Sequence, residues 1–236
     1  MKRLLLASNS TSFGRGYLDH CIGEITALLA GSQGRIVFVP YAIGNWQVYA
    51  DKVRERLEPT GFAVHSVHEA ADEAGRSKLL RDADAIFIGG GNTFRLLETL
   101  YRFNLLDEIR NAVSRGARYM GASAGATVAG PTIKTTNDMP IIYPPSFDAL
   151  GLVPFNINPH YLDPDPNSTH MGETRPMRIA EFHELNEVPV IGLREGAMLV
   201  VEDAQVTLTG TSGARLFRKG LEPVEFASGA RLDFLM

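Results

Sequence analysis

The stretch Arg118-Tyr119-Met120-Gly121-Ala122-Ser123-Ala124-Gly125 runs from the end of an apolar strand pattern into a helical pattern that begins at Ala124. A serine between two glycines at such a corner is typical of a nucleophile elbow, where only small flanking residues fit. The corner lifts the Ser123 hydroxyl clear of the sheet and points the following backbone N–H groups at one spot. The alternative is a helix that uses the serine as its N-terminal cap. Both interpretations place a strand-to-helix connection here, the unit of α/β folds.

Outward from this corner, short apolar runs alternate with helical patterns through the first half of the chain. The predicted buried strands are 4–7, 35–39, 63–67, 85–88 and 118–120, and the predicted helices are 17–29, 46–57, 92–101 and 105–113. This alternation predicts an α/β fold, a mainly parallel sheet with helices on both faces. Ligands bind beyond the carboxyl ends of the strands in such sheets. Gly89 and Ser123 both follow strands there, which favours a catalytic role for the corner.

The second half of the chain is less regular. Residues 130–172 are rich in Pro, Asn, Thr and Asp, but their aromatic and branched side chains argue against disorder. A short strand is predicted at 155–157, then a helix over 174–185 and a strand over 188–193. The tail patterns at 197–201, 206–209, 216–218 and 224–226 predict a short antiparallel C-terminal extension at one sheet edge. Without a linker or repeat, residues 1–236 are expected to form a single domain.

Composition excludes several classes of function. The 236 residues carry a net charge of −4 with both signs interspersed, so nucleic acid and anionic membranes are not expected partners. The apolar run at the N-terminus ends at Ala7, too short for a signal peptide, which predicts a cytoplasmic protein. Cys21, the single cysteine, is expected to be a small core residue. No metal site and no cofactor are predicted, because the sequence has no HExxH motif and one cysteine cannot build a thiolate cluster. Asp163 and Asp165 could chelate calcium, but Pro164 and Pro166 favour an ordinary loop.

The segment Gly89-Gly90-Gly91-Asn92-Thr93 follows the predicted strand 85–88 and is the second chemical signal. Glycines let the backbone approach a ligand and expose its N–H groups, and Asn92 or Thr93 is suited to cap the next helix. A phosphate site is disfavoured because the lysine of a P-loop is absent and Phe94 stands where a dinucleotide fingerprint has glycine. An oxyanion hole that combines Gly90 or Gly91 with Ala124 fits better. A plain glycine turn remains the alternative.

A serine nucleophile needs a base and an acid that orients it. Among six histidines, His160 is the first candidate because it follows a short predicted strand and Pro159 restricts the backbone before it. His170, in the polar loop, is the second candidate. For the acid, Asp138 lies in the irregular segment and Glu195 follows the strand 188–193. The residues alone leave the choice between these two carboxylates open.

Taken together, seven segments resemble the aspartyl dipeptidases of serine peptidase family S51, in the same order from about residue 3 to about residue 220. They are 89–94, 121–126, 135–140, 147–150, 158–160, 172–175 and 192–193. The resemblance implies a cytoplasmic serine peptidase that removes N-terminal aspartate from dipeptides and a few short peptides. It also implies a fold similar to that of the class I glutamine amidotransferases, with serine in place of their elbow cysteine.

By residue match, the resemblance assigns Ser123 as nucleophile and His160 as base, while Asp138 and Glu195 compete as the third member. We expect one of the two acids to orient His160 and the other to contact substrate or support the loop. An aspartyl side chain requires a cation, for which Arg175 is the candidate, with Arg178 one turn further along the same helix. Either arginine would otherwise pair with a glutamate such as Glu173. Asn92 and Thr93 are further expected substrate contacts.

The expected partner is therefore a small peptide with an N-terminal aspartate, and a homodimer is a candidate assembly. Two alternatives stay open at this point. One is a peptidase of the cyanophycinase type that cleaves β-aspartyl-arginine bonds. The other is a binding module without catalysis that senses a small acidic metabolite. An esterase of the α/β-hydrolase type is disfavoured because Asp138 and His160 follow Ser123 too closely in the chain.

Overall fold

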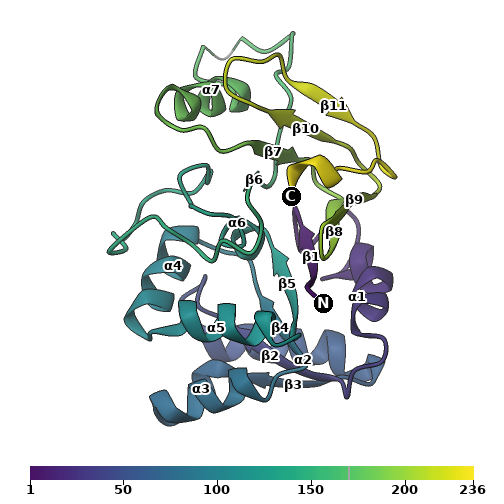
Figure 1. Ribbon diagram of the computed structural model, residues 1–236, viewed down its shortest axis with the longest axis vertical. Coiled ribbons are helices and arrows are strands. Elements are labelled where there is room, and N and C mark those ends of the chain that lie inside the picture. Colours follow the sequence, from purple (N-terminus) through teal and green to yellow (C-terminus); the bar gives the residue numbers. More distant parts are fainter. Residues whose placement is uncertain (170) are drawn as a thin grey trace.

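A seven-stranded sheet in the order β3-β2-β4-β5-β1-β8-β9 forms the centre of the computed structural model, which describes residues 1–169 and 171–236 (Figure 1). Strands β1 to β5 run parallel, and β8 and β9 add antiparallel pairs at the β1 edge. Their bounds are β1 Arg3–Ala7, β2 Arg35–Val39, β3 Ala63–Ser66, β4 Ala85–Ile88, β5 Arg118–Ala122, β8 Ala197–Glu202 and β9 Gln205–Gly210. The prediction of a mainly parallel α/β sheet is confirmed.

Helices cover both faces of this sheet because successive strand residues point to opposite sides. In β1, Leu5 and Ala7 pack in the core beneath α1 and α2, whereas Leu4 and Leu6 pack in the core beneath α3 to α6. The helices are α1 Ile22–Leu29, α2 Trp46–Leu57, α3 Glu73–Arg81, α4 Thr93–Arg102, α5 Leu105–Ser114 and α6 Ala124–Thr127; 3₁₀ turns span Asp19–Cys21, Glu58–Thr60, Val67–Glu69 and Asp233–Leu235. None of the helices that the structure describes is long and apolar enough to cross a membrane.

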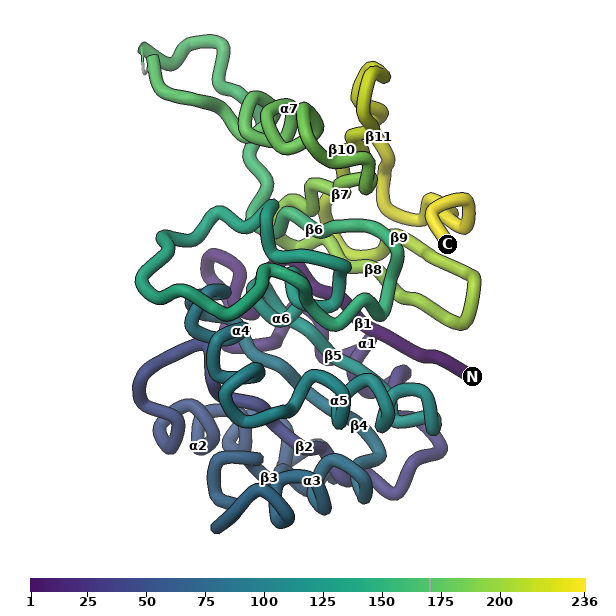
Figure 2. The backbone as a smooth tube through the Cα atoms, turned by 60° about the vertical axis from the view of Figure 1, so that its left-hand side comes forward, coloured from purple at the N-terminus to yellow at the C-terminus, as the bar shows by residue number. Residues whose placement is uncertain are grey.

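A second sheet of four strands, in the order β11-β10-β7-β6, lies with the helix α7 at one end of the molecule (Figures 1 and 2). Its elements are β6 Asn156–Asn158, α7 Arg175–Leu185, β7 Val190–Leu193, β10 Ala214–Phe217 and β11 Val224–Phe226. The predicted C-terminal extension is therefore divided. Strands β8 and β9 extend the central sheet, while β10 pairs with β7 and draws β11 into the second sheet.

The sequence patterns missed the helix α3. Leu80 is its one buried residue, so no apolar stripe marks it, and the cap in which Asp72 accepts a hydrogen bond from the Gly75 N–H is a weak local signal. Residues 130–155 are irregular, as predicted, yet Ile133, Leu150 and Phe155 are buried in the main core. This packing holds the long irregular segment against the carboxyl ends of the strands.

Candidate active site

Ser123 lies in a strained turn between β5 and α6, with φ 54° and ψ −113°. A Cβ on Gly121 would collide with the carbonyl oxygen of Gly125, and a Cβ on Gly125 would collide with that of Ile88. These contacts explain why only glycine fits on either side of the turn. The alternative interpretation as a capping serine is wrong, because the Ser123 side chain makes no cap hydrogen bond in the described structure. The turn presents the hydroxyl outward instead.

His160 meets this hydroxyl, with Nε2 2.9 Å from Ser123 Oγ. It follows β6 and has a positive φ of 51°, a conformation rare for residues with a Cβ. Ser8, at the end of β1, stabilises this backbone: its Oγ accepts a hydrogen bond from His160 N at 2.9 Å and donates to Leu193 O at 2.9 Å. The buried Ser8 hydroxyl thus connects the backbone at His160 to the carboxyl ends of β1 and β7.

Glu195 lies on the other side of the imidazole, with Oε1 2.7 Å from His160 Nδ1. Glu195 follows β7. The backbone just after it is held by a hydrogen bond that Gly196 N donates to Asn9 Oδ1 at 2.8 Å. The carboxylate makes Nδ1 the protonated nitrogen, so Nε2 is left to accept the Ser123 proton. Ser123, His160 and Glu195 therefore form a continuous hydrogen-bonded row, the arrangement that activates a serine.

Asp138 is engaged elsewhere. Its Oδ2 accepts hydrogen bonds from Thr93 N at 2.7 Å and Thr93 Oγ1 at 2.5 Å, at the first turn of α4. Asn92 caps the same helix by accepting from Arg95 N at 3.0 Å. These hydrogen bonds satisfy N–H groups at the N-terminus of α4. Asn92 and Thr93, which were expected to contact substrate, therefore both make hydrogen bonds within the protein. Asn137, the neighbour of Asp138, donates to Pro159 O at 2.9 Å, so this loop also braces the segment that carries His160.

Of the predicted oxyanion donors, Gly90 and Gly91 line the same cavity as Ser123, and Ala124 follows the serine in the chain. A Cβ on Gly90 would lie 3.6 Å from Ser123 Oγ, which shows how closely the glycine loop approaches. Burial raises the pKa of the Tyr49 phenol, and the Gly90 N–H that faces its hydroxyl acts in the opposite direction. Within residues 1–169 and 171–236, the Gly91 and Ala124 N–H groups donate to no other group. These two N–H groups are the ones available to a ligand.

A cavity of about 380 Å³ opens over the serine. Ser123, His160, Gly90 and Gly91 line one part of it, and the rest is lined by residues 9–11, Tyr17, Ile43, Val48, Tyr49 and Lys52. Its size is at the lower end of the range of about 300–1,000 Å³ for small-ligand sites. The α2 residues, Ser8 and Asn9 were not predicted to belong to the site. Ser8 and Asn9 directly follow a predicted strand, a position that marks them as site residues.

Arg175 and Arg178 line a different cavity, of about 490 Å³, together with Leu162 and Asp163. Partial burial lowers the pKa of Arg175, and the nearby Arg178 charge acts in the same direction. Arg178 pairs with Glu173 at 3.5 Å, as the alternative interpretation of the arginines expects. The structure therefore does not bring the two arginines into the cavity over Ser123. His170, the second candidate base, lies outside the described residues.

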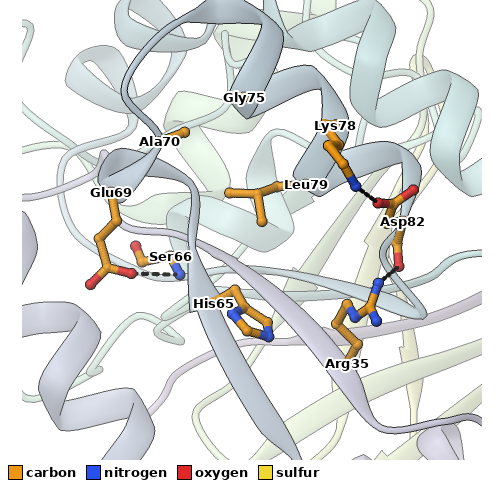
Figure 3. Close-up of a pocket in the computed structure, with 9 residues that line it drawn as sticks. All are labelled: Arg35, His65, Ser66, Glu69, Ala70, Gly75, Lys78, Leu79 and Asp82. Carbon is orange, nitrogen blue, oxygen red and sulfur yellow. Dashed lines mark hydrogen bonds and ion pairs between the residues drawn. The ribbon is translucent and has the colours of Figure 1, made fainter.

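A larger cavity, of about 530 Å³, lies between the edge strand β3 and α3 (Figure 3). Its charged groups already have partners: Lys78 Nζ lies 2.5 Å from Asp82 Oδ2, Arg35 Nη1 donates to Asp82 O at 3.2 Å, and Glu69 pairs with Arg54. None of the three residues of the hydrogen-bonded row lines it. No group of three or more His, Cys, Asp or Glu residues in the described part of the chain is placed to hold a metal ion.

Comparison with known proteins gives consistent matches. The model of peptidase family S51 matches residues 4–209. The chain is 54% identical to "Peptidase E" of Streptomyces coelicolor over 99% of this chain and 94% of that protein. It is 48% identical to "Probable alpha-aspartyl dipeptidase" of Drosophila melanogaster, covering 100% of this chain and 98% of that protein. Its fold is similar to the crystal structure of a peptidase from an acI-B1 Actinobacterium, with a TM-score of 0.75, 18% identity, and coverage of 98% and 96%.

Proposed function

The chain belongs to peptidase family S51 and is a serine-type peptidase, and we propose that it hydrolyses dipeptides with an N-terminal aspartate through an acyl-enzyme on Ser123. The observation that carries the proposal is the hydrogen-bonded row from Ser123 through His160 to Glu195. The substrate class follows from the name of the Drosophila relative, which shares 48% of its residues with this chain.

In the proposed mechanism, His160 Nε2 takes the Ser123 proton while Oγ attacks the aspartyl carbonyl carbon. The Gly91 and Ala124 N–H groups stabilise the oxyanion, since both are free to donate, Gly91 lines the cavity of Ser123 and Ala124 is the next residue in the chain. The imidazolium, stabilised by Glu195, then gives its proton to the leaving amine. Water, deprotonated by His160, attacks the acyl-enzyme and releases aspartate. In this assignment Glu195 is the third member of the catalytic triad. Asp138 supports the N-terminus of α4, and its loop supports the backbone before His160.

Arg175 is our proposed receptor for the aspartyl side chain. It is partly buried, and among residues 1–169 and 171–236 it forms no ion pair with a carboxylate. An arginine fork matches a carboxylate in two hydrogen bonds, the geometry that aspartate selectivity needs. Its cavity begins at Leu162, two residues beyond His160, so a contact with substrate requires the two cavities to join when the substrate is bound. Arg175→Ala should lower the preference for Asp-Leu over Ala-Leu, and Arg178→Ala should not. Equal loss on both peptides would contradict this role.

We further infer that the chain acts as one domain in the cytoplasm. The domain inference is supported by the row itself, because Ser123 follows a strand of the central sheet while His160 and Glu195 follow strands of the second sheet. Either sheet alone would lack part of the site. A homodimer is the assembly we propose to test, by light scattering of the purified protein.

The deciding experiment measures aspartate release from Asp-Leu by the wild type and by Ser123→Ala, with Ala-Leu and β-Asp-Arg as control peptides. Cleavage of Asp-Leu alone, lost in the variant, supports the proposed function. Preferential cleavage of β-Asp-Arg would identify a β-aspartyl peptidase instead. Binding of aspartate without turnover of any peptide would favour a binding module.

A further inference from the structure

Lys52 is the cationic side chain of the cavity that opens over Ser123. It lies on α2, and its Nζ is 4.4 Å from the centre of the Tyr17 ring. No aspartate or glutamate lines this cavity within residues 1–169 and 171–236. The lining of the cavity therefore includes an ammonium group and no carboxylate, which favours an anionic ligand.

Asp51, the carboxylate next to Lys52 in sequence, is engaged elsewhere. Asp51 accepts hydrogen bonds from Gln47 at 2.8 Å and Arg54 at 3.1 Å. In the described part of the chain Lys52 forms no ion pair, and its ammonium group lies over the face of the Tyr17 ring. Tyr17 in turn packs edge-on against Tyr49, whose hydroxyl faces the Gly90 N–H. Two aromatic rings thus connect the ammonium group to the glycine loop beside Ser123.

We propose that Lys52 binds the C-terminal carboxylate of the dipeptide, an inference that rests on the proposed function. A dipeptide with N-terminal aspartate carries two carboxylates, one on the aspartyl side chain and one at its C-terminus. The planar guanidinium of Arg175 suits the side chain, which must be distinguished from similar groups by geometry. A lysine is a point charge on a flexible stem, so it suits a carboxylate whose position shifts with the identity of the leaving residue.

The surroundings of Lys52 fit the leaving residue. Ile43 and Val48 line the same cavity and offer apolar contact to a side chain such as leucine. Lys52 is exposed, so it lies at the rim through which a released amino acid would depart. In a longer peptide or a peptide amide, a neutral group would occupy the position of the carboxylate. Lys52 therefore acts as a specificity residue that favours dipeptides with a free C-terminus.

The test compares kcat/KM for Asp-Leu and Asp-Leu-amide in the wild type and in Lys52→Met. The wild type should prefer the free acid by about ten-fold, the effect of one charge-assisted hydrogen bond. In Lys52→Met this preference should disappear, mainly through a higher KM for the acid, because the contact is made equally in ground and transition states. Lys52→Arg should retain most of the preference. Lys78→Met makes the same change of net charge on α3, away from the cavity, and should leave the ratio unchanged.

Three results would overturn the inference while the proposed function stands. They are equal rates on acid and amide in the wild type, an unchanged ratio in Lys52→Met, and loss of the preference for Asp-Leu over Ala-Leu in Lys52→Met with the acid-to-amide ratio intact. The last would mean that Lys52 binds the aspartyl side chain. If the wild type released aspartate from neither peptide, the proposed function itself would fail, and this inference with it.

Discussion

Arg194 forms a bidentate ion pair with Asp163, in which Nε lies 2.7 Å from Oδ2 and Nη2 lies 2.8 Å from Oδ1. Asp163 lies three residues beyond His160, and Arg194 immediately precedes Glu195. The pair therefore joins the two segments that carry the base and its acid. Arg194 also reaches Glu225 of β11 at 3.0 Å, which anchors the pair to the second sheet. A bidentate pair restricts orientation as well as distance, so it keeps the His160 and Glu195 segments in register.

Asp163→Asn is expected to lower kcat on Asp-Leu by about ten-fold with KM little changed, because a small displacement of His160 and Glu195 affects the reaction more than binding. Steady-state kinetics on the two proteins check this expectation. Asp165→Asn, in the same loop but without a contact to Arg194, is the matched control. A rise in KM at constant kcat would show that the pair acts on substrate binding instead.

The same pair makes stability depend on acid pH. The Arg194 hydrogen bond lowers the pKa of Asp163 below its ordinary value of 3.8. Because the pKa in the folded state is the lower one, the stabilisation is present above about pH 4 and is lost as the pH falls through the folded value. The Asp163 side chain is 46% exposed, so solvent screening limits the effect to about 1 kcal/mol or less. Urea unfolding at pH 7 and pH 3 should show a larger difference between the wild type and Asp163→Asn at the higher pH.

Substitution of the two competing acids separates their roles. Glu195→Gln removes the charge beside His160 Nδ1 and is expected to lower kcat by on the order of 10²-fold. Asp138→Asn keeps one oxygen that can cap Thr93, so kcat should fall by less than about ten-fold, while stability falls by about 1 kcal/mol. Kinetics and thermal unfolding measured together distinguish the cases. The reverse pattern would assign Asp138, and not Glu195, to His160.

Ser8 is expected to affect both stability and rate. Ser8→Ala removes an acceptor from His160 N and a donor from Leu193 O, and the site is buried. Leaving such groups unpaired costs about 1–3 kcal/mol, and the backbone that carries His160 loses its support. We expect reduced unfolding free energy together with a lower kcat. Ser114→Ala removes an exposed hydroxyl at the end of α5, whose one hydrogen bond within the described residues goes to Asn111 O, and should change neither quantity.

The elbow glycines tolerate no side chain. Gly125→Ala would drive a Cβ into the Ile88 carbonyl, a rigid strand group, and is expected to destabilise the fold by about 3 kcal/mol or more. Gly23→Ala, in the exposed part of α1 where a Cβ meets nothing within 4 Å, is expected to stabilise by about 0.5–1 kcal/mol. Chemical unfolding of both variants gives the comparison. Similar effects of the two substitutions would argue against a steric requirement at the elbow.

Cys21 is expected to be unreactive in the native protein. Burial raises the pKa of its thiol to about 12, so the reactive thiolate is scarce near pH 8. Labelling with iodoacetamide at pH 8 should be slow in buffer and fast in guanidinium chloride. Rapid labelling of the folded protein would show that the segment around Cys21 opens readily.

Local sequence predicted much of the fold. The helix α2 begins and ends at the predicted residues 46 and 57, and β2 and β4 have their predicted bounds. The helix α2 has apolar residues at helical spacing, and β2 and β4 are continuous apolar runs, so each conformation is decided within a few residues. The polar helix α3 lacks such a pattern and was missed. The likeness to class I glutamine amidotransferases stays a prediction.

The sequence by itself determined the corner at Ser123, because the steric demands of Gly121 and Gly125 arise from neighbouring residues and adjoining strands of a predictable sheet. Tertiary structure alone decided which acid meets His160. Glu195 lies 35 residues from His160 in the chain, and the parallel pairing of β6 with β7 brings the ends of the two strands together. The same holds for Lys52, which lines the cavity over Ser123 because α2 packs beside the carboxyl end of β4, where Tyr49 lies against Gly89. Such contacts depend on the register and packing of distant elements, about which local periodicity carries no information.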